Sequence, residues 1–373
     1  MSRTDDVQLT VGEFVQRLAE RFPLEWAEDW DRSGLLAGDS SAPLRSVLVT
    51  LDADRAAVQR AVIGGHDLLL THHPALLSGG LPITPDGPYG VAFDAVRAGV
   101  SLVAMHTNLD RSPAGASALA TALGLEGCVP LETAAQPVAV VATFVPPEAA
   151  EKVAVAARAA GAGRVGMYEA CVFWSSGSGH FASPVKGRRA SADVAPTEVS
   201  EVRLETTCAP DAASSVMEAI RTAHPYEEPV VTRQDGGVSR GQARLGRFCT
   251  LSTPVTLAAV AAKCSKVLGT GNRTWGDPDK QITRVAVANG SGGSLIAAAR
   301  AVQADVLVTG EVRYHDARAA LEVGLTIVDV GHDASEWPIV RVLAHAAREA
   351  LAGTEVHIAE ERPALPWWTT ERH

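Results

Sequence analysis

The sequence predicts an α/β protein whose two-part core, with mostly parallel sheets, is interrupted by a smaller α+β domain. The chain has 373 residues, which suits two to three domains of about 150 residues each. Strands alternate with short helices through roughly the first 130 residues and again from residue 284, a rhythm typical of parallel sheets. The stretch between them follows the order β-α-β-β-α-β of a ferredoxin-like domain. We therefore expect residues 1–132 and 235–373 to form the core and residues 133–234 to form the insert.

Two helices in the first part of the core are marked by the residues at their ends. Thr10 caps a helix over residues 11–22, which Pro23 stops. Ser112 caps a second helix, which has Pro113 at its first position. The elements between these two helices are expected as strands at 46–51, 67–71 and 101–105 and helices at 55–63 and 91–98.

The insert and the second part of the core are read from the same kinds of pattern. In the insert we expect strands at 138–144, near 170–174 and at 202–207, and helices at 147–160 and 211–223. Residues 175–196 are rich in Ser, Gly and Arg, which indicates an exposed loop. The second part of the core is expected to contain strands at 285–288, 305–308 and 325–330 and helices at 295–302, 314–322 and 339–351.

The composition excludes several classes of protein. A formal net charge of −10 argues against a protein that grips phosphate backbones, because such proteins need a basic surface. The first residues lack the apolar core of a signal peptide, and no apolar run approaches the ~18 residues of a membrane span. The five cysteines are scattered and form no CxxC pair, which predicts reduced thiols, neither a disulfide framework nor a sulfur-based zinc site, and a cytoplasmic location.

Histidines and acidic residues gather where predicted strands end. The segments that carry them are His72-His73, His106 to Asp110, Tyr314-His315-Asp316 and His332 to Glu336. Ligands collect at the carboxyl ends of strands in open α/β folds, and adjacent strand residues point to opposite sides. One pair of histidines can therefore address two positions. Nitrogen and carboxylate donors without cysteine suit pairs of Zn, Mn or Fe(II) ions.

Three local questions stay open at this point. His332 and Glu336 are one helical turn apart, but Pro338 predicts that the regular helix begins only near itself, so close approach of the two side chains is not assured. Asp110 could simply form the turn before the Ser112 cap. Residues 290–294 (GSGGS) could cradle a phosphate, although Leu295 stands where a dinucleotide fingerprint has its third glycine, and a tight turn is favoured.

Several motifs together carry a resemblance to a known family. They are Trp30–Leu35 (WDRSGL), Asp67–Pro74 (DLLLTHHP), His106–Asp110 (HTNLD), Thr309–Asp316 (TGEVRYHD) and Gly331–Glu336 (GHDASE). In this order they closely resemble the GTP cyclohydrolase I type 2 family, also called the Nif-three-like dinuclear-metal proteins. Segments of the middle region look like the PII/CutA-like insert of its longer members, namely Val145–Glu148, Gly161–Gly163, Tyr168–Cys171 and His224–Pro229.

The resemblance implies a ligand set for two divalent metal ions per subunit, of Zn, Mn or Fe. The implied ligands are His72, His73, Asp110, His332 and Glu336. His73 and Asp110 are implied on one ion and His72 and His332 on the other, with Glu336 bridging them. We expect His106, His315 and Asp316 to orient ligands or to transfer protons.

The activity implied by the resemblance is hydrolytic opening of the guanine ring of GTP, with release of formate, to give a dihydroneopterin triphosphate. The implied assembly is a homohexamer, and the expected partner is a small, nucleotide-like substrate, with no membrane or nucleic acid involved. Two alternatives stay open: a non-catalytic metal-binding regulator or scaffold, and a dinuclear hydrolase that acts on another substrate.

Overall fold

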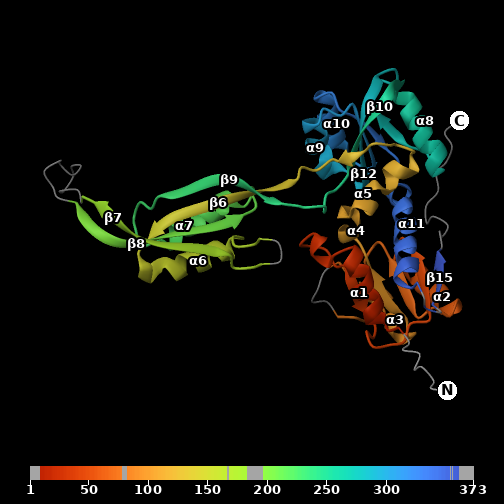
Figure 1. Ribbon diagram of the computed structural model, residues 1–373, viewed down its shortest axis with the longest axis horizontal. Helices are drawn as coiled ribbons and strands as arrows, with labels where there is room; N and C mark the ends of the chain where they lie inside the picture. Colours follow the sequence, from red (N-terminus) through yellow and green to blue (C-terminus); the bar gives the residue numbers. More distant parts are fainter. Residues whose placement is uncertain are drawn as a thin grey trace. The chain divides into compact units, whose positions relative to one another are not determined.

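The computed structural model describes residues 9–77, 82–165, 168–182, 196–352, 354 and 356–360. The chain divides into two compact units, each of which is shown in Figure 1. The core unit comprises Met1–Thr133 and Gly241–His373, and the insert unit comprises Ala134–Arg240. The insert unit ends six residues beyond the expected position 234, because its last strand continues to Ser239.

The first sheet of the core unit has the strand order β1-β4-β3-β2-β15. The strands are β1 (Gly34–Ala37), β2 (Ser46–Thr50), β3 (Leu68–Thr71), β4 (Ser101–Ala104) and β15 (His357–Glu360). All neighbours are parallel except β1, which runs antiparallel to β4. Every residue of β3 and β4 is buried, as expected for strands covered on both faces.

Helices cover both faces of this sheet. On one face lie α1 (Val11–Arg21) and the later turns of α11 (His332–Ala350). On the other lie α2 (Arg55–Ile63) and α3 (Gly90–Arg97). The expected cap of α1 is present. The side-chain hydroxyl of Thr10 accepts a hydrogen bond from the backbone N–H of Glu13, and the carboxylate of Glu13 accepts one from the backbone N–H of Thr10.

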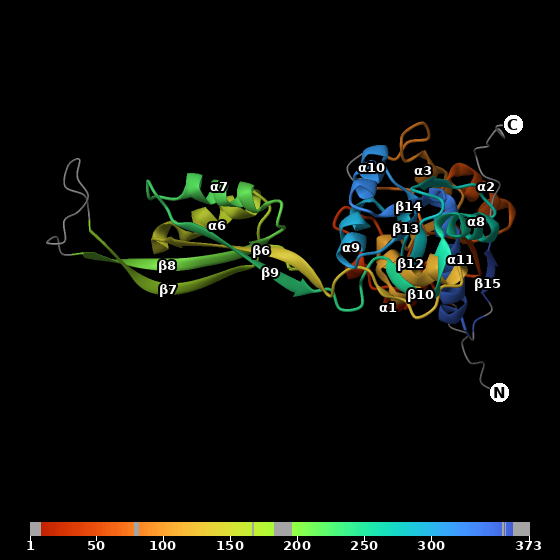
Figure 2. The same ribbon diagram turned by 90° about the horizontal axis from the view of Figure 1, so that it is seen from above.

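The second sheet of the core unit has the order β11-β14-β13-β12-β10-β5. Its strands are β5 (Val129–Pro130), β10 (Arg247–Thr256), β11 (Arg273–Trp275), β12 (Gln281–Ser291), β13 (Val306–Glu311) and β14 (Thr326–Asp329). The central three, β12, β13 and β14, are parallel. Helices α9 (Ile296–Ala301) and α10 (Tyr314–Glu322) pack on one face, and α5 (Pro113–Ala122) and α8 (Leu257–Leu268) on the other (Figure 2).

Helix α11 belongs to the cores of both sheets. It begins just after β14, lies beside α5 and reaches β15 (Figure 1). Ala334 packs with the second sheet, whereas Leu343 and Ala347 pack with the first. The expectation that the helix begins near Pro338 is wrong: it begins at His332, because the proline removes only the N–H that would bond the carbonyl of residue 334.

The insert unit is an antiparallel sheet covered on one face by two helices. Its elements follow the order β6 (Ala135–Val145), α6 (Ala150–Ala159), β7 (Val172–Phe181), β8 (Thr197–Cys208), α7 (Ala213–Ala223) and β9 (Val231–Ser239). The strand order is β7-β8-β6-β9, and a separate apolar cluster forms between the sheet and α6 and α7. The expected loop over residues 175–196 is partly wrong, since Ser175–Phe181 pair with β8; residues 183–195 lie outside the described residues.

Cys128 and Cys249 form a disulfide, so the expectation of reduced thiols without a disulfide is wrong for this pair. The pairing of β5 with β10 explains it. Val129 lies opposite Phe248, so the next pair along the register is Cys128 with Cys249, whose Cα atoms are 4.3 Å apart. The two cysteines are 121 residues apart in the sequence, so nothing local announces the bond. Cys171, Cys208 and Cys264 are free.

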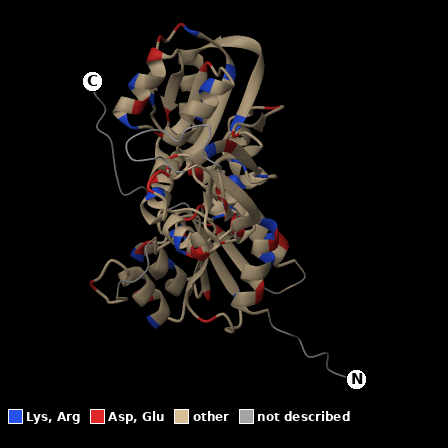
Figure 3. Ribbon diagram, turned by 90° about the vertical axis from the view of Figure 1, so that its left-hand side faces the viewer, with Lys and Arg blue, Asp and Glu red and all other residues tan. Residues whose placement is uncertain are grey.

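The remaining helical segments are short: η1 (Leu24–Trp26), α4 (Thr107–Arg111), η2 (Pro147–Ala149) and η3 (Gly293–Leu295). Basic and acidic residues are interspersed along the ribbon (Figure 3). Within the described residues, no helix combines the length and the apolar character that a membrane crossing requires.

Candidate metal centre

The candidate site lies in the core unit, where strand ends of its two sheets meet. His72 and His73 directly follow β3, and His106 follows β4. Asp110 lies on the short helix α4, and the first turns of α11 carry His332 and Glu336. The structure thus brings together six of the eight side chains that the sequence analysis selected.

The carboxylate of Glu336 is central to the site. Its Oε2 lies 2.8 Å from Nε2 of His73 and 3.1 Å from Nε2 of His332. Its Oε1 faces Nε2 of His72 at 3.8 Å. The same His72 nitrogen is 3.6 Å from Oδ2 of Asp110. The two oxygens of Glu336 therefore face two different sets of ligand atoms.

These distances group the ligands differently from the resemblance. The resemblance implies His73 with Asp110 and His72 with His332, whereas the short distances join His72 to Asp110 and His73 to His332. The side chains of His72 and His73 do address two positions. His72 is fully buried, and the side chain of His73 is 25% exposed.

The outer nitrogen of His72 and of His332 faces an acceptor. Nδ1 of His72 is 2.9 Å from the carbonyl oxygen of Met105, and Nδ1 of His332 is 3.4 Å from a carboxylate oxygen of Glu311. An imidazole whose Nδ1–H is donated outward carries its lone pair on Nε2, which is the form that binds a metal.

The outer nitrogens of His73 and His106 face carboxylates. Nδ1 of His73 is 2.7 Å from Oδ1 of Asp52, and Nδ1 of His106 is 2.7 Å from Oδ1 of Asp31. Neither aspartate is among the site residues predicted from the sequence. The signal for Asp52 was present, because this residue follows a strand end just as His72 and His106 do.

Unpartnered buried atoms show that the site fits a cation. Nε2 of His72 and Oδ1 of Asp110 are buried and have no hydrogen-bond partner among the described residues. Leaving such atoms without a partner costs free energy, and a cation that both atoms bind removes that cost. Two groups of side chains place their ligand atoms within 4.8 Å of one another: His72, His73 and His106, and His73, His332 and Glu336. Nitrogen and oxygen donors without sulfur suit Zn, Mn or Fe(II).

The pKa shifts follow from burial and from these contacts. Burial raises the pKa of Glu336, but its interactions with His332, His72 and His73 outweigh burial and hold that pKa well below its usual range. Burial lowers the pKa of His73, but Asp52 and Glu336 outweigh it and raise it to about 10. A pKa of about 10 favours the protonated ring at neutral pH, so a cation at Nε2 of His73 would have to replace a proton.

The glycine-rich turn after β12 forms a wall of the site, with Gly290 against the carboxylate of Glu336. Gly290 has a φ of +56°, and a Cβ there would lie 2.2 Å from Oε1 of Glu336. Its N–H is donated to the hydroxyl of Ser335, and the N–H of Gly292 to the carbonyl of Glu311. These N–H groups are used within the protein, which supports the tight turn that the sequence favoured.

His315 and Asp316 do not join the cluster. They lie exposed in the first turn of α10, and His315 packs edge-on against Tyr314. Within the described residues neither side chain contacts a member of the cluster. The motif places them after β13, and Asp316 lies near the glycine-rich turn, since a Cβ at Gly293 would be 3.7 Å from its Oδ2.

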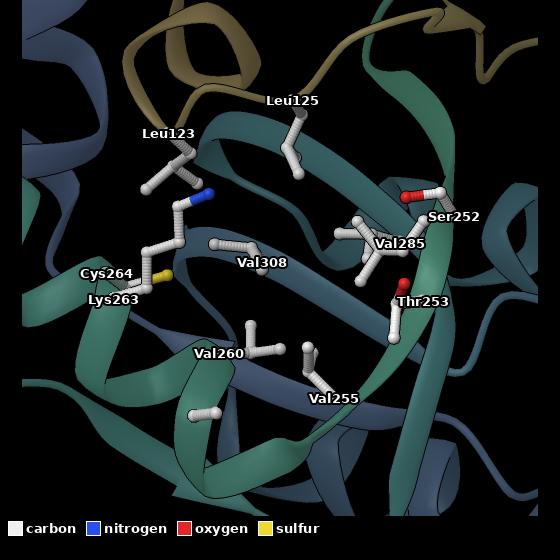
Figure 4. A pocket seen from close by; sticks show the side chains of 12 residues that line it. Leu123, Leu125, Ser252, Thr253, Val255, Val260, Lys263, Cys264, Val285 and Val308 are labelled. Atoms are coloured by element: carbon white, nitrogen blue, oxygen red, sulfur yellow. The ribbon is translucent and has the colours of Figure 1, made fainter.

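An apolar pocket of about 330 Å³ lies elsewhere in the core unit, between α8 and β10 (Figure 4). Val285 and Val308 line it, and Lys263 stands at its edge. It shares no lining residue with the histidine cluster. The candidate chemistry therefore belongs to the histidine cluster.

Comparisons with known proteins agree with the motifs. The model of the family described as Duf34/NIF3 (NGG1p interacting factor 3) matches residues 9–363. A protein of Mycobacterium leprae called "GTP cyclohydrolase 1 type 2 homolog" is 34% identical over 347 residues, covering 88% of this chain and 87% of its own. A Bacillus subtilis protein of the same name is 33% identical over 359 residues, covering 94% and 96%.

A solved structure agrees as well. The crystal structure of a Bacillus cereus protein related to NIF3 is 31% identical to this chain and superposes with a TM-score of 0.65, covering 97% of this chain and 99% of its own. Both the sequence and the fold therefore match along nearly the whole length. This chain belongs to the Duf34/NIF3 family.

Proposed function

We propose that this protein is a dinuclear metal-dependent hydrolase that opens the guanine ring of GTP and releases formate, giving a dihydroneopterin triphosphate. The observation that carries the proposal is the position of Glu336, whose two oxygens face separate sets of histidines around buried atoms that lack partners. The substrate class is supported by the names of the M. leprae and B. subtilis relatives.

In this proposal His72 and Asp110 would hold one cation, His73 and His332 would hold the other, and the carboxylate of Glu336 lies within reach of both sets of ligand atoms. When bound, such a pair of cations supplies Lewis acidity that makes a water molecule acidic enough to give hydroxide near neutral pH. Addition of a water at C8 of guanine opens the ring to a formamide, and a second water hydrolyses the formamide and releases formate. The ribose carbons then rearrange and close the dihydropterin ring with loss of one water, so that one water is consumed in all.

His106 is the proton-transfer group in this proposal. Its ring lies 5.2 Å from the ring of His72 and 5.8 Å from that of His73, measured between centroids. Asp31 holds its Nδ1, so that Nε2 is left to accept or donate a proton at the leaving nitrogen. His315 and Asp316, which the sequence analysis selected for the same task, have no part in it because they lie outside the cluster.

The test is GTP turnover by protein loaded with Mn, Fe(II) or Zn. We expect formate release by the wild type and a loss of at least about 100-fold in Glu336→Gln, because the substitution removes the charge shared by both positions. The matched control is Glu322→Gln, an exposed glutamate of α10, which should keep wild-type turnover.

Equal turnover in wild type and Glu336→Gln, or none in the wild type with any of the three metals, would overturn the hydrolase. A thermal-shift series then separates the remaining functions. Stabilisation by metal alone favours the regulator or scaffold, and stabilisation by a different metabolite favours a hydrolase with another substrate.

We further propose that the working form is a homohexamer, as the resemblance implies. Light scattering of the native protein should then give a mass about six times the 38.9 kDa of the chain.

A further inference from the structure

The loop after β2 places a carboxylate beside a candidate ligand. Asp52 lies two residues beyond the end of β2, which is the parallel neighbour of β3. The backbone N–H of His73 donates to the carbonyl oxygen of Leu51 at 2.9 Å. This bond ties the loop after β3 to the loop after β2, so Asp52 and the His73 ring are held side by side.

The ring of His73 lies between two carboxylates. On its outer side Nδ1 is 2.7 Å from Oδ1 of Asp52, and on its inner side Nε2 is 2.8 Å from Oε2 of Glu336. The side chain of Asp52 is 54% exposed, whereas that of Glu336 is 5% exposed. The outer carboxylate can therefore orient the ring without belonging to the buried cluster.

We propose that Asp52 is a positioning residue of the metal centre, which fixes the His73 ring through Nδ1 and thereby sets the affinity of the position that His73 shares with His332. The inference rests on the proposed metal centre and adds to it a residue outside the ligand set. The charge-assisted bond holds the proton on Nδ1, fixes the rotation of the ring and makes Nε2 a stronger donor.

Asp31 makes the corresponding bond to His106, but it is less suited to a test. Its side chain is fully buried and also accepts hydrogen bonds from Thr107, Ser33 and the backbone of Arg32. Replacing it would disturb the whole loop. Among the described residues, the carboxylate of Asp52 has the His73 ring as its only partner, so its substitution changes one contact at an exposed position.

The experiment measures metal affinity. Chelator-treated full-length protein is titrated with Zn²⁺ against a chromophoric competitor, using wild type, Asp52→Asn and Asp52→Ala. We expect Asp52→Ala to weaken one of two binding events by about 10–100-fold and to leave the other within about twofold. Asp52→Asn should lose less affinity for Zn²⁺, because the amide oxygen of the asparagine still accepts a hydrogen bond from the Nδ1–H of His73 although it carries no charge.

The matched control is Asp279→Asn, which removes the same charge from an exposed position ahead of β12. Circular dichroism of each metal-free variant establishes that it is folded. Wild-type affinity in Asp52→Ala, or an equal loss at both positions or in Asp279→Asn, overturns the inference.

The outcomes for the inference and for the proposed reaction are distinct. A wild type that binds no Zn²⁺ overturns the metal centre and the role of Asp52 together. A wild type that binds Zn²⁺ but turns over no GTP overturns only the reaction, and a selective loss in Asp52→Ala then still supports the role of Asp52.

Discussion

At the scale of single residues, the site depends on which nitrogen of each histidine is free. The outer nitrogens of His72 and His73 meet very different partners, a backbone carbonyl in one case and the half-exposed carboxylate of Asp52 in the other. Both arrangements leave Nε2 facing inward, toward Glu336. The ligand positions are therefore set as much by residues outside the cluster as by the histidines themselves.

The raised pKa of His73 leads to a prediction for the metal-free protein. Its pKa is about 10 in the folded state against an ordinary value of 6.5, so the folded state favours the charged ring. The resulting stabilisation is complete below pH about 6.5 and is lost as the pH rises toward 10. Urea unfolding of chelator-treated protein at pH 6.5, 8 and 9.5 should show this contribution falling with pH.

The control for this prediction is His73→Gln, in which the decline between pH 6.5 and 9.5 should be shallower because the titrating ring is gone. Parallel profiles for wild type and variant would show that His73 does not hold its proton in the folded protein.

At the scale of elements, local signals predicted what local chemistry determines. Thr10 and Ser112 cap α1 and α5 as expected, because a cap needs only the residues of its own turn. The pairing of β5 with β10 joins segments more than a hundred residues apart, and no local pattern reveals it. The early start of α11 was missed because Pro338 argued against it, while packing of the helix against both sheets supports it.

The residues of the candidate site divide in the same way, into those that local patterns predicted and those that depend on distant segments. His72, His73 and His106 were predicted from strand ends, because parallel strands place their ends at one edge of a sheet. His315 and Asp316 carried an equally good motif, yet they lie exposed in the first turn of α10 and do not join the cluster. Asp52 also follows a strand end, but it was missed because its bond to His73 on the neighbouring loop cannot be read from its own segment.

The prediction for the elements concerns the contribution of the disulfide to the free energy of unfolding. Cys128 and Cys249 close a loop that contains the whole insert unit, and cross-linking a long loop restricts the unfolded chain. Replacing Cys128 by serine should lower the free energy of unfolding by about 2–4 kcal/mol. Calorimetry of protein purified without reductant measures this, with Cys171→Ser as the control because Cys171 is a free thiol.

Adding reductant should lower the unfolding temperature of the wild type and leave that of Cys128→Ser unchanged. If mass spectrometry of the wild type purified without reductant finds both thiols free, the bond does not form in solution.

At the scale of the whole molecule, the candidate chemistry belongs to one unit. Every member of the cluster, from His72 to Glu336, lies in the core unit. The chain leaves that unit after Thr133 and returns at Gly241, and the N–H of Arg240 donates to the carbonyl oxygen of Ala134 at 2.9 Å. The two ends of the insert are therefore adjacent, which is the usual condition for one domain to be inserted into another.

This adjacency predicts that the insert can be removed. Joining Thr133 to Gly241 by a short Gly-Ser linker should give a core that folds, because the sheets, the disulfide between Cys128 and Cys249 and helix α11 all remain. Its Zn²⁺ affinity should stay within about twofold of the full chain, since no member of the cluster has been removed. Competition titration measures the affinity, with Glu336→Gln in the full chain as the variant expected to lose it. A folded core that binds Zn²⁺ tenfold more weakly would show that the insert unit contributes to the metal centre.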